Sequence, residues 1–244
     1  MVELKDIRGD FHNHSNYTDG SNTLEEMALA AKRQGWDWVA LGDHSQSLRV
    51  AGGLSVADLR KTIAEVRRLN ERLKGIELLR SMEVDVLKDG KMDYHDEVLD
   101  EIDVVIASVH SAFSQPEEEM TRRIQRAASH PGVDIIGHLS GRLIGRRDAY
   151  RYDAEAIFKT AAEAGAAFEL NGQPSRQDLN DVAAKRAKGL GLALAVTTDA
   201  HSCAQFDYME LAVCTARRAW LEKKDLINCM GFKELQEWLR RKRS

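Results

Sequence analysis

Seven short apolar runs alternate with amphipathic, helix-like patterns along this chain. Several runs are continuously apolar, as over residues 104–107 and 192–196, which is typical of parallel strands that are covered on both faces. Each run ends at polar residues, which separate it from the helical pattern that follows. The seven predicted strands span residues 7–14, 36–44, 76–85, 104–110, 133–138, 166–171 and 192–201.

Helix signals fall between these runs. Thr23 and Glu26 have the spacing of a capping box, and Ser55 precedes apolar residues at helical spacing. Gly165 and Gly189 stand where helix C-caps are expected. The alternation of strand and helix predicts a single α/β domain over residues 1–244, built on a parallel sheet. A closed barrel is favoured over a doubly wound open sheet, because the polar strand ends then face one common centre.

The composition is that of a globular domain that can bury a sizeable core, with 244 residues of which 43% are hydrophobic. The charged start does not resemble a signal peptide, and no apolar run approaches the length of a membrane span. The three cysteines, Cys203, Cys214 and Cys229, form no CxxC pair and leave one unmatched. We therefore expect buried free thiols, no membrane partner and a cytoplasmic location.

The charge balance bears on the choice of partner. The net charge is −4, and the one basic run covers residues 240–243, where a solvated helix end is expected. Proteins that hold long duplex DNA usually carry a basic face that displaces counterions. The balance therefore disfavours a strong general DNA binder.

Histidines and carboxylates follow six of the predicted strands. His12 and His14 are two residues apart, as are Asp199 and His201, so each pair projects from one face of its strand. This mixture of imidazole and carboxylate suits zinc, manganese or iron. The candidate metal ligands are His12, His14, Asp19, His44, Glu83, His110, His138, Asp199 and His201.

Nine ligands exceed the coordination number of one ion, so two or three divalent ions are predicted. Glu83 is the expected bridge, because a carboxylate offers two oxygens. Three divalent ions would outweigh the negative charge of the three carboxylates and favour a metal-bound hydroxide with an anionic substrate. This favours phosphate ester hydrolysis over amide hydrolysis. The candidate catalytic residues are Glu83, His110 and Asp199, and the candidates for gripping phosphate are Arg142 and Arg176.

The motif at residues 8–15, Arg-Gly-Asp-Phe-His-Asn-His-Ser, resembles the first motif of the PHP (polymerase and histidinol phosphatase) family. Later motifs match in order around the other candidate ligands, and the resemblance covers essentially the whole chain. Residues 169–178 and 216–221 make it most similar to the C-terminal PHP domain of bacterial and archaeal family-X DNA polymerases. Three departures leave every ligand in place: Phe11 for the usual leucine, Gly42 where threonine is common, and Met82 before the bridging glutamate.

The resemblance implies a distorted, TIM-like (β/α)7 barrel with a trinuclear centre. Carried over by position, one ion would be held by His12, His14, Glu83 and Asp199, a second by Glu83, His110 and His138, and a third by Asp19, His44 and His201. The implied activity is that of a 3′–5′ exonuclease or a 3′-end processing enzyme. The implied partners are a nucleic-acid 3′ end and, functionally, a DNA polymerase core.

Two alternatives stay open. One is a small-molecule phosphomonoesterase of the histidinol-phosphatase type, whose partner is a phosphorylated small molecule. The other is a non-catalytic module that stabilises or docks a polymerase. Polymerase-core and helix-hairpin-helix elements are not recognised in this sequence, so we expect a stand-alone relative or an excised domain.

Overall fold

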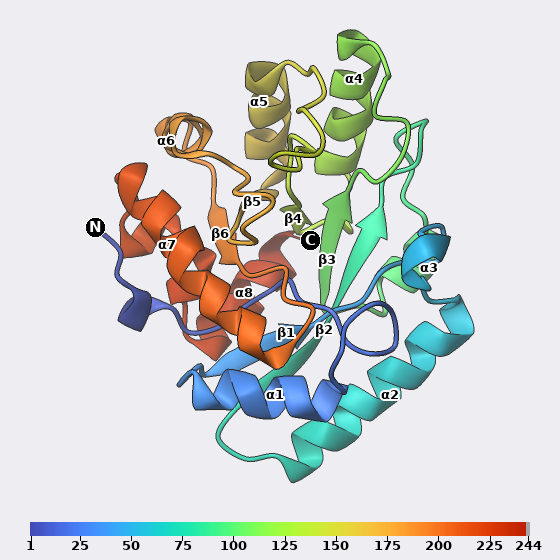
Figure 1. The fold of residues 1–244 in the computed structure, drawn as a ribbon, viewed down its shortest axis with the longest axis vertical. Coiled ribbons are helices and arrows are strands. Elements are labelled where there is room, and N and C mark those ends of the chain that lie inside the picture. Colours follow the sequence, from blue (N-terminus) through green and yellow to red (C-terminus); the bar gives the residue numbers. More distant parts are fainter. Residues whose placement is uncertain (243–244) are drawn as a thin grey trace.

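A curled sheet of parallel strands lies at the centre of the molecule, and helices surround it (Figure 1). The computed structural model describes residues 1–242, so Arg243 of the terminal basic run lies outside the described residues. Within that range the sheet contains six strands, which follow one another in sequence order. The strands are β1 (Trp38–Leu41), β2 (Glu77–Asp85), β3 (Val104–Ser108), β4 (Ile135–Ile136), β5 (Ala167–Asn171) and β6 (Leu194–Thr197).

The helices begin and end largely where the sequence signals predict. The capping box of Thr23 opens the first helix, Ser55 caps the second, and Gly165 ends the fifth in the left-handed conformation. The expectation for Gly189 was wrong, because the sixth helix includes it and Gly191 takes the positive φ of 77°. The helices are α1 (Leu24–Arg33), α2 (Val56–Arg72), α3 (Asp96–Leu99), α4 (Glu117–Ala128), α5 (Ala154–Ala164), α6 (Asp181–Gly189), α7 (Met209–Arg218) and α8 (Phe232–Lys242).

The first predicted strand, residues 7–14, is extended but forms only one isolated bridge, between Asn13 and Ala200. Its carbonyl groups accept hydrogen bonds from β1 on one side and from the segment after β6 on the other. The ladder is interrupted because the Asp10 carboxylate accepts from the Thr198 hydroxyl and backbone amide. This segment therefore joins the two edge strands and closes a distorted TIM-like barrel, with six regular strands where seven were expected.

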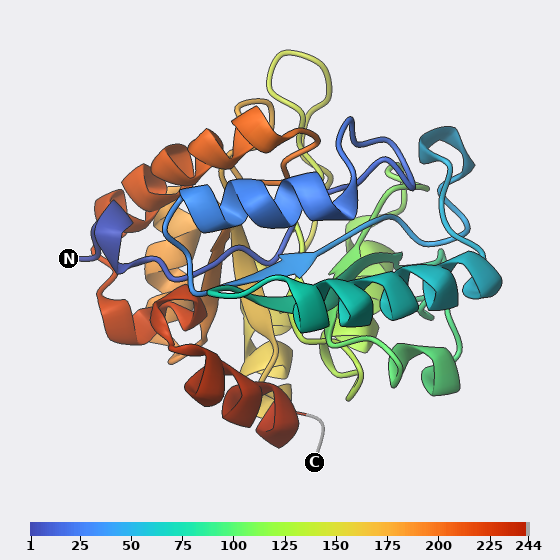
Figure 2. The ribbon, with the colours of Figure 1, turned by 90° about the horizontal axis from the view of Figure 1, so that it is seen from below.

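Side chains alternate between two cores on the two faces of the sheet. In β1, Val39 and Leu41 pack outward against the helices, whereas Trp38 and Ala40 point to the inner face. Leu235 and Leu239 of α8 join this inner cluster. Figure 2 shows α8 on the side of the molecule opposite the projecting loop between β4 and α5. The barrel interior is thus filled with apolar side chains and covered at one end by α8.

Two further expectations concern the whole chain. No helix within residues 1–242 is long and apolar enough to cross a membrane. The three cysteines are free, as predicted, but the expectation that they are buried was wrong, because Cys214 is exposed and Cys203 and Cys229 are only partly buried.

Gly42 marks a close approach between the first segment and β1. A Cβ at this position would lie 2.3 Å from the Asn13 carbonyl oxygen, so no side chain is accommodated here without a shift of the backbone. We expect Gly42→Ala to lower the free energy of unfolding by about 1–3 kcal/mol in denaturant titrations, as overpacking usually does. Gly189→Ala is the matched control, because a Cβ there meets no atom within 4 Å. Equal unfolding midpoints for both variants would contradict this packing account.

Candidate metal centre

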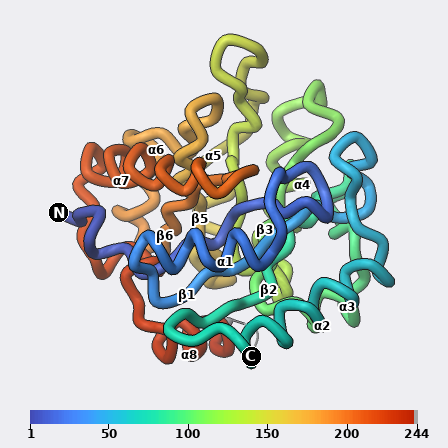
Figure 3. The backbone as a smooth tube through the Cα atoms, turned by 60° about the horizontal axis from the view of Figure 1, so that its bottom comes forward, coloured from blue at the N-terminus to red at the C-terminus, as the bar shows by residue number. Residues whose placement is uncertain are grey.

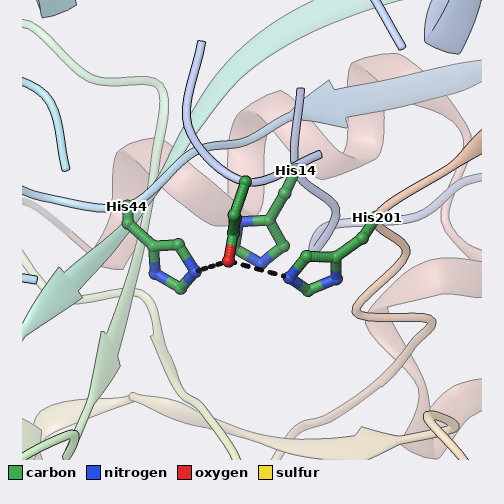
Figure 4. A group of neighbouring side chains, drawn as sticks. His14, His44 and His201 are labelled. Atoms are coloured by element: carbon green, nitrogen blue, oxygen red, sulfur yellow. Dashed lines mark ion pairs between the residues drawn. The ribbon is translucent and has the colours of Figure 1, made fainter. Parts of the chain in front are cut away.

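All nine predicted ligands lie at the same end of the barrel, although they come from loops and strands far apart in the sequence. Strands β1, β2, β3, β4 and β6 carry predicted ligands near or just past their C-terminal ends, which meet at one end of the barrel because parallel strands all point the same way. Figure 4 shows His14, His44 and His201 directed toward one point. At that point Asp19 Oδ2 lies 3.5 Å from His44 Nε2 and 3.4 Å from His201 Nε2.

Glu83 occupies the middle of the cluster and contacts five imidazole rings. Its Oε1 lies 2.7 Å from His138 Nε2 and 3.3 Å from His110 Nε2. Its Oε2 faces the other histidines, at 2.9 Å from His44 Nδ1 and 3.3 Å from His12 Nε2. The two carboxylate oxygens therefore face different histidines, which is the arrangement a bridging ligand needs.

Three groups of side chains place their ligand atoms within 4.8 Å of one another: His14, Asp19, His44 and His201; His12, His14 and Asp199; and His44, Glu83 and His110. The first contains the complete trio expected for the third ion, with His14 in addition. In the last group His44 stands where His138 was expected. The assignment of ligands to individual ions stays a prediction, but every group can bind a divalent cation.

The polar atoms of the cluster are suited to metal coordination. Buried side-chain atoms are normally hydrogen-bonded. Five atoms of the cluster are buried and, although some lie close to one another, form no hydrogen bond of acceptable geometry among residues 1–242: His12 Nε2, His14 Nδ1, His44 Nδ1, His138 Nδ1 and Glu83 Oε2. Imidazole nitrogens and carboxylate oxygens are the donors that zinc and related ions prefer. The donor set therefore fits divalent metal ions.

The charges in the cluster are strongly coupled. Burial alone would raise the pKa of Glu83, but His110 and the other rings outweigh it and hold this pKa well below its usual value. Burial would lower the pKa of His44, yet Glu83 and Asp19 raise it to about 10. For His14, burial and the neighbouring His44 charge lower the pKa to about 3. The site thus keeps its carboxylates ionised beside at least one neutral imidazole, the forms that bind metal.

A second layer of carboxylates, which the sequence analysis did not identify as functional, orients the ligand rings. Glu169 Oε1 lies 2.5 Å from His12 Nδ1, and Asp85 Oδ1 lies 2.6 Å from His110 Nδ1. These contacts turn the opposite nitrogen of each ring toward Glu83. Such outer carboxylates fix the tautomer and raise the basicity of ligating histidines.

The functional role of Glu169 could have been predicted from the alternation of inward and outward side chains along its strand. It is two residues from Ala167, whose side chain belongs to the inner core, so both point into the barrel. A charged residue at an inward position of a buried strand requires a partner. Its partners are His12, the Thr197 hydroxyl at 2.6 Å and the His138 backbone amide at 2.5 Å.

We expect Glu169→Gln to weaken metal binding by about ten- to a hundredfold, because glutamine cannot hold His12 with a full charge. Competition with a chromophoric chelator measures this affinity directly. Glu155→Gln is the control, since that residue pairs with Arg186 on the surface of α5. Unchanged affinity in Glu169→Gln would show that the outer carboxylate does not tune the site.

The two candidate phosphate-binding arginines are placed differently. Arg176 lies near the cluster, with Nε 3.5 Å from Asp199 Oδ2 and a buried Nη1 that has no hydrogen-bond partner within residues 1–242. Burial and then the Arg176 charge lower the pKa of His138. Arg142 donates from Nη2 to the carbonyl oxygens of Arg176 and Gln177, at 2.9 and 2.7 Å. Arg142 therefore holds the loop that carries Arg176, and direct contact of either with phosphate stays a prediction.

Comparison with known proteins gives one family. Residues 10–173 match the model of the PHP domain. The chain is 40% identical over 241 residues to the DNA polymerase/3′-5′ exonuclease PolX of Bacillus subtilis, covering 99% of this chain and 42% of that protein. It thus spans less than half the length of this relative. A protein from Thermoanaerobacter that is named a probable phosphatase is 27% identical, covering 96% of this chain and 95% of that protein.

Solved structures share the fold. A Lactococcus lactis histidinol phosphate phosphatase, crystallised with zinc, L-histidinol and phosphate, superposes with a TM-score of 0.61 at 17% identity. The match covers 88% of this chain and 95% of that one. A Listeria monocytogenes protein superposes with a TM-score of 0.65 at 15% identity, covering 81% and 96% of the two chains. At these identities the superpositions establish the barrel fold.

Proposed function

The chain belongs to the PHP family and is a metal-dependent phosphoesterase, and on this premise we propose that it acts on the 3′ end of a nucleic-acid strand. The 40% identity to the polymerase and 3′-5′ exonuclease of Bacillus subtilis, which extends over 99% of the chain, carries the nucleic-acid part of the proposal. The proposed reaction is hydrolysis of the terminal phosphodiester. Zinc, manganese or iron, in two or three copies, is the proposed cofactor.

The candidate site residues have different roles in the proposed reaction. The nine candidate ligands would hold the ions, which supply an activated water molecule and neutralise phosphate charge when they are bound. Asp85 fixes the His110 ring so that Nε2 faces the reaction site. Arg176 places a positive charge beside Asp199, where it can pair with a phosphate oxygen. Asp19 and His201 are the most exposed members, with 35% and 30% of their side chains accessible, so substrate would enter on their side.

A small-molecule phosphomonoesterase is the second candidate. It is supported by relatives named as probable phosphatases, which match nearly their whole length at 27% identity. The zinc, histidinol and phosphate bound by the Lactococcus lactis structure point the same way. This candidate predicts efficient release of inorganic phosphate from monoesters and little cutting of diesters.

A non-catalytic, polymerase-associated module is the third candidate. If this candidate is correct, the His110→Ala substitution leaves the phosphoesterase activity of the purified protein unchanged. The orphaned buried donors around Glu83 argue against it, because a structural core would pair or remove them.

One experiment separates the three candidates. Purified protein loaded with zinc or manganese is incubated with 5′-labelled single-stranded DNA and, in parallel, with small phosphomonoesters. We expect progressive shortening from the 3′ end and slower release of phosphate from the monoesters. His110→Ala provides the blank, and His130→Ala is the matched control, because His130 pairs with Asp96 away from the cluster. Turnover of neither substrate would refute the phosphoesterase proposal.

A further inference from the structure

The loop at residues 139–150, which joins β4 to α5, is called the arginine loop below. It projects from the body of the molecule in Figures 2 and 3, and an antiparallel bridge between Leu143 and Arg147 closes the turn at its tip. Gly145 turns the chain near its tip with a φ of 75°. The loop carries three arginines and one acidic residue, in a chain whose net charge is −4. Positive charge is therefore concentrated locally on an acidic protein.

Hydrogen bonds join the arginine loop to the metal-binding cluster. The Ile144 amide donates to the Ser175 carbonyl oxygen at 2.7 Å. The Arg142 side chain donates to the Arg176 carbonyl oxygen, and Arg176 in turn reaches Asp199. A cavity of about 520 Å³ lies along residues 142–148, and its volume is within the range of small-ligand sites. The loop thus continues the site outward instead of forming a separate surface.

The positive charges of the arginine loop have no acidic partners in the described part of the chain. Within residues 1–242, none of Arg142, Arg146 and Arg147 forms an ion pair with a carboxylate. The Nε of Arg142 is buried without a hydrogen-bond partner in the same range. Burial and then repulsion from Arg176 lower the pKa of Arg147. Such an uncompensated cluster favours a bound polyanion.

An aromatic platform lies under the loop. The Arg147 guanidinium carbon is 3.8 Å from the centroid of the Phe113 ring. Phe113 stacks on Tyr150 with a centroid distance of 6.3 Å, and it follows His110 by three residues. Tyr150 is only 8% exposed and Arg147 covers one face of Phe113, so the two rings hold the Arg147 guanidinium in place. A guanidinium plane held in this way is a surface on which an unpaired base can stack.

We propose that the arginine loop binds the sugar-phosphate backbone of a single strand, upstream of the nucleotide that is removed. The inference rests on the proposed function and names the element that recognises its substrate. Isolated phosphomonoesters would not reach Arg146, so the contribution of the loop should grow with strand length. The bases of a duplex are already stacked and would not use the Arg147 guanidinium plane.

Arg146→Glu is the test variant, because the structure gives the Arg146 side chain no hydrogen bond or ion pair within residues 1–242. Arg67→Glu is the matched control; Arg67 is exposed on α2 and lines a cavity with Phe232 of α8, at the other end of the barrel. Binding of a labelled single strand of about twelve nucleotides is followed by fluorescence anisotropy. Turnover of that strand, of a dinucleotide and of p-nitrophenyl phosphate is measured in parallel.

For Arg146→Glu we expect the Kd and KM of the long strand to rise about three- to tenfold, with a shallower salt dependence. The dinucleotide and p-nitrophenyl phosphate should be turned over as by the wild type. Unchanged binding of the long strand would overturn the inference for the arginine loop, even if the strand is cleaved. A wild type that binds the strand through the loop but cleaves no strand would support the inference and refute the proposed exonuclease activity.

Discussion

Replacement of Glu83 by glutamine is expected to lower kcat/KM for phosphate ester hydrolysis by at least about a thousandfold, since metal ions supply most of the charge stabilisation in such reactions. Glutamine keeps the size of the side chain but loses the charge and one of the two oxygen donors. The Glu83 oxygens face His138 and His110 on one side and His44 and His12 on the other. Losing this bridge should also reduce the number of ions bound per chain, as measured by elemental analysis.

Glu77→Gln is the control for that variant. Glu77 opens the same strand, β2, at its opposite end, and is exposed. It should leave activity and metal content unchanged. Wild-type turnover by Glu83→Gln, at unchanged metal content, would exclude a bridging role.

Replacement of Arg80 by methionine is expected to lower the free energy of unfolding by about 3–5 kcal/mol, because removing one partner leaves the other charge buried and unpaired. Arg80 is only 1% exposed in its side chain, and Nη2 lies 2.8 Å from Asp43 Oδ2. Asp43 also accepts hydrogen bonds from the hydroxyl groups of Ser15 and Thr18, which belong to the loop that carries Asp19. The buried pair thus anchors that loop to the barrel.

Urea titration monitored by circular dichroism measures the loss. Arg60→Met is the matched control, because Arg60 pairs with Glu101 on the surface, where its side chain is 58% exposed. Exposed pairs contribute about 0–1 kcal/mol, so this variant should unfold close to the wild type. A similar midpoint for Arg80→Met and Arg60→Met would contradict the anchoring role of the buried pair.

The clustering of the nine side chains can be predicted from the sequence because its signal is local, whereas their role as metal ligands stays a prediction. Parallel strands bring their C-terminal ends together, so a histidine such as His110 at the end of an apolar run is already placed. The capping box at Thr23 and the apolar runs of β3 and β6 are equally local signals. Each of these features can be recognised from a short stretch of sequence.

The parts that could not be predicted depend on distant contacts. Arg80 pairs with Asp43, which lies 37 positions away in the sequence. Helix α8, which lies late in the sequence, covers one end of the barrel interior. The first segment loses its ladder because Asp10 accepts hydrogen bonds from Thr198, 188 positions away. No local pattern specifies which side chain replaces a backbone partner. Arginine is a residue type that commonly binds phosphate, but Arg142 donates two hydrogen bonds to backbone carbonyl groups instead.

The central claim is that the clustered histidines and carboxylates form a multinuclear metal centre that hydrolyses phosphate esters. Its most direct test is to titrate chelator-treated protein with manganese or zinc while following hydrolysis of a labelled single strand and of a phosphomonoester. We expect no turnover without metal, and activity that rises beyond one ion per chain and levels off at two or three. Full turnover in excess chelator, or no turnover of either substrate at any metal ratio, would contradict it.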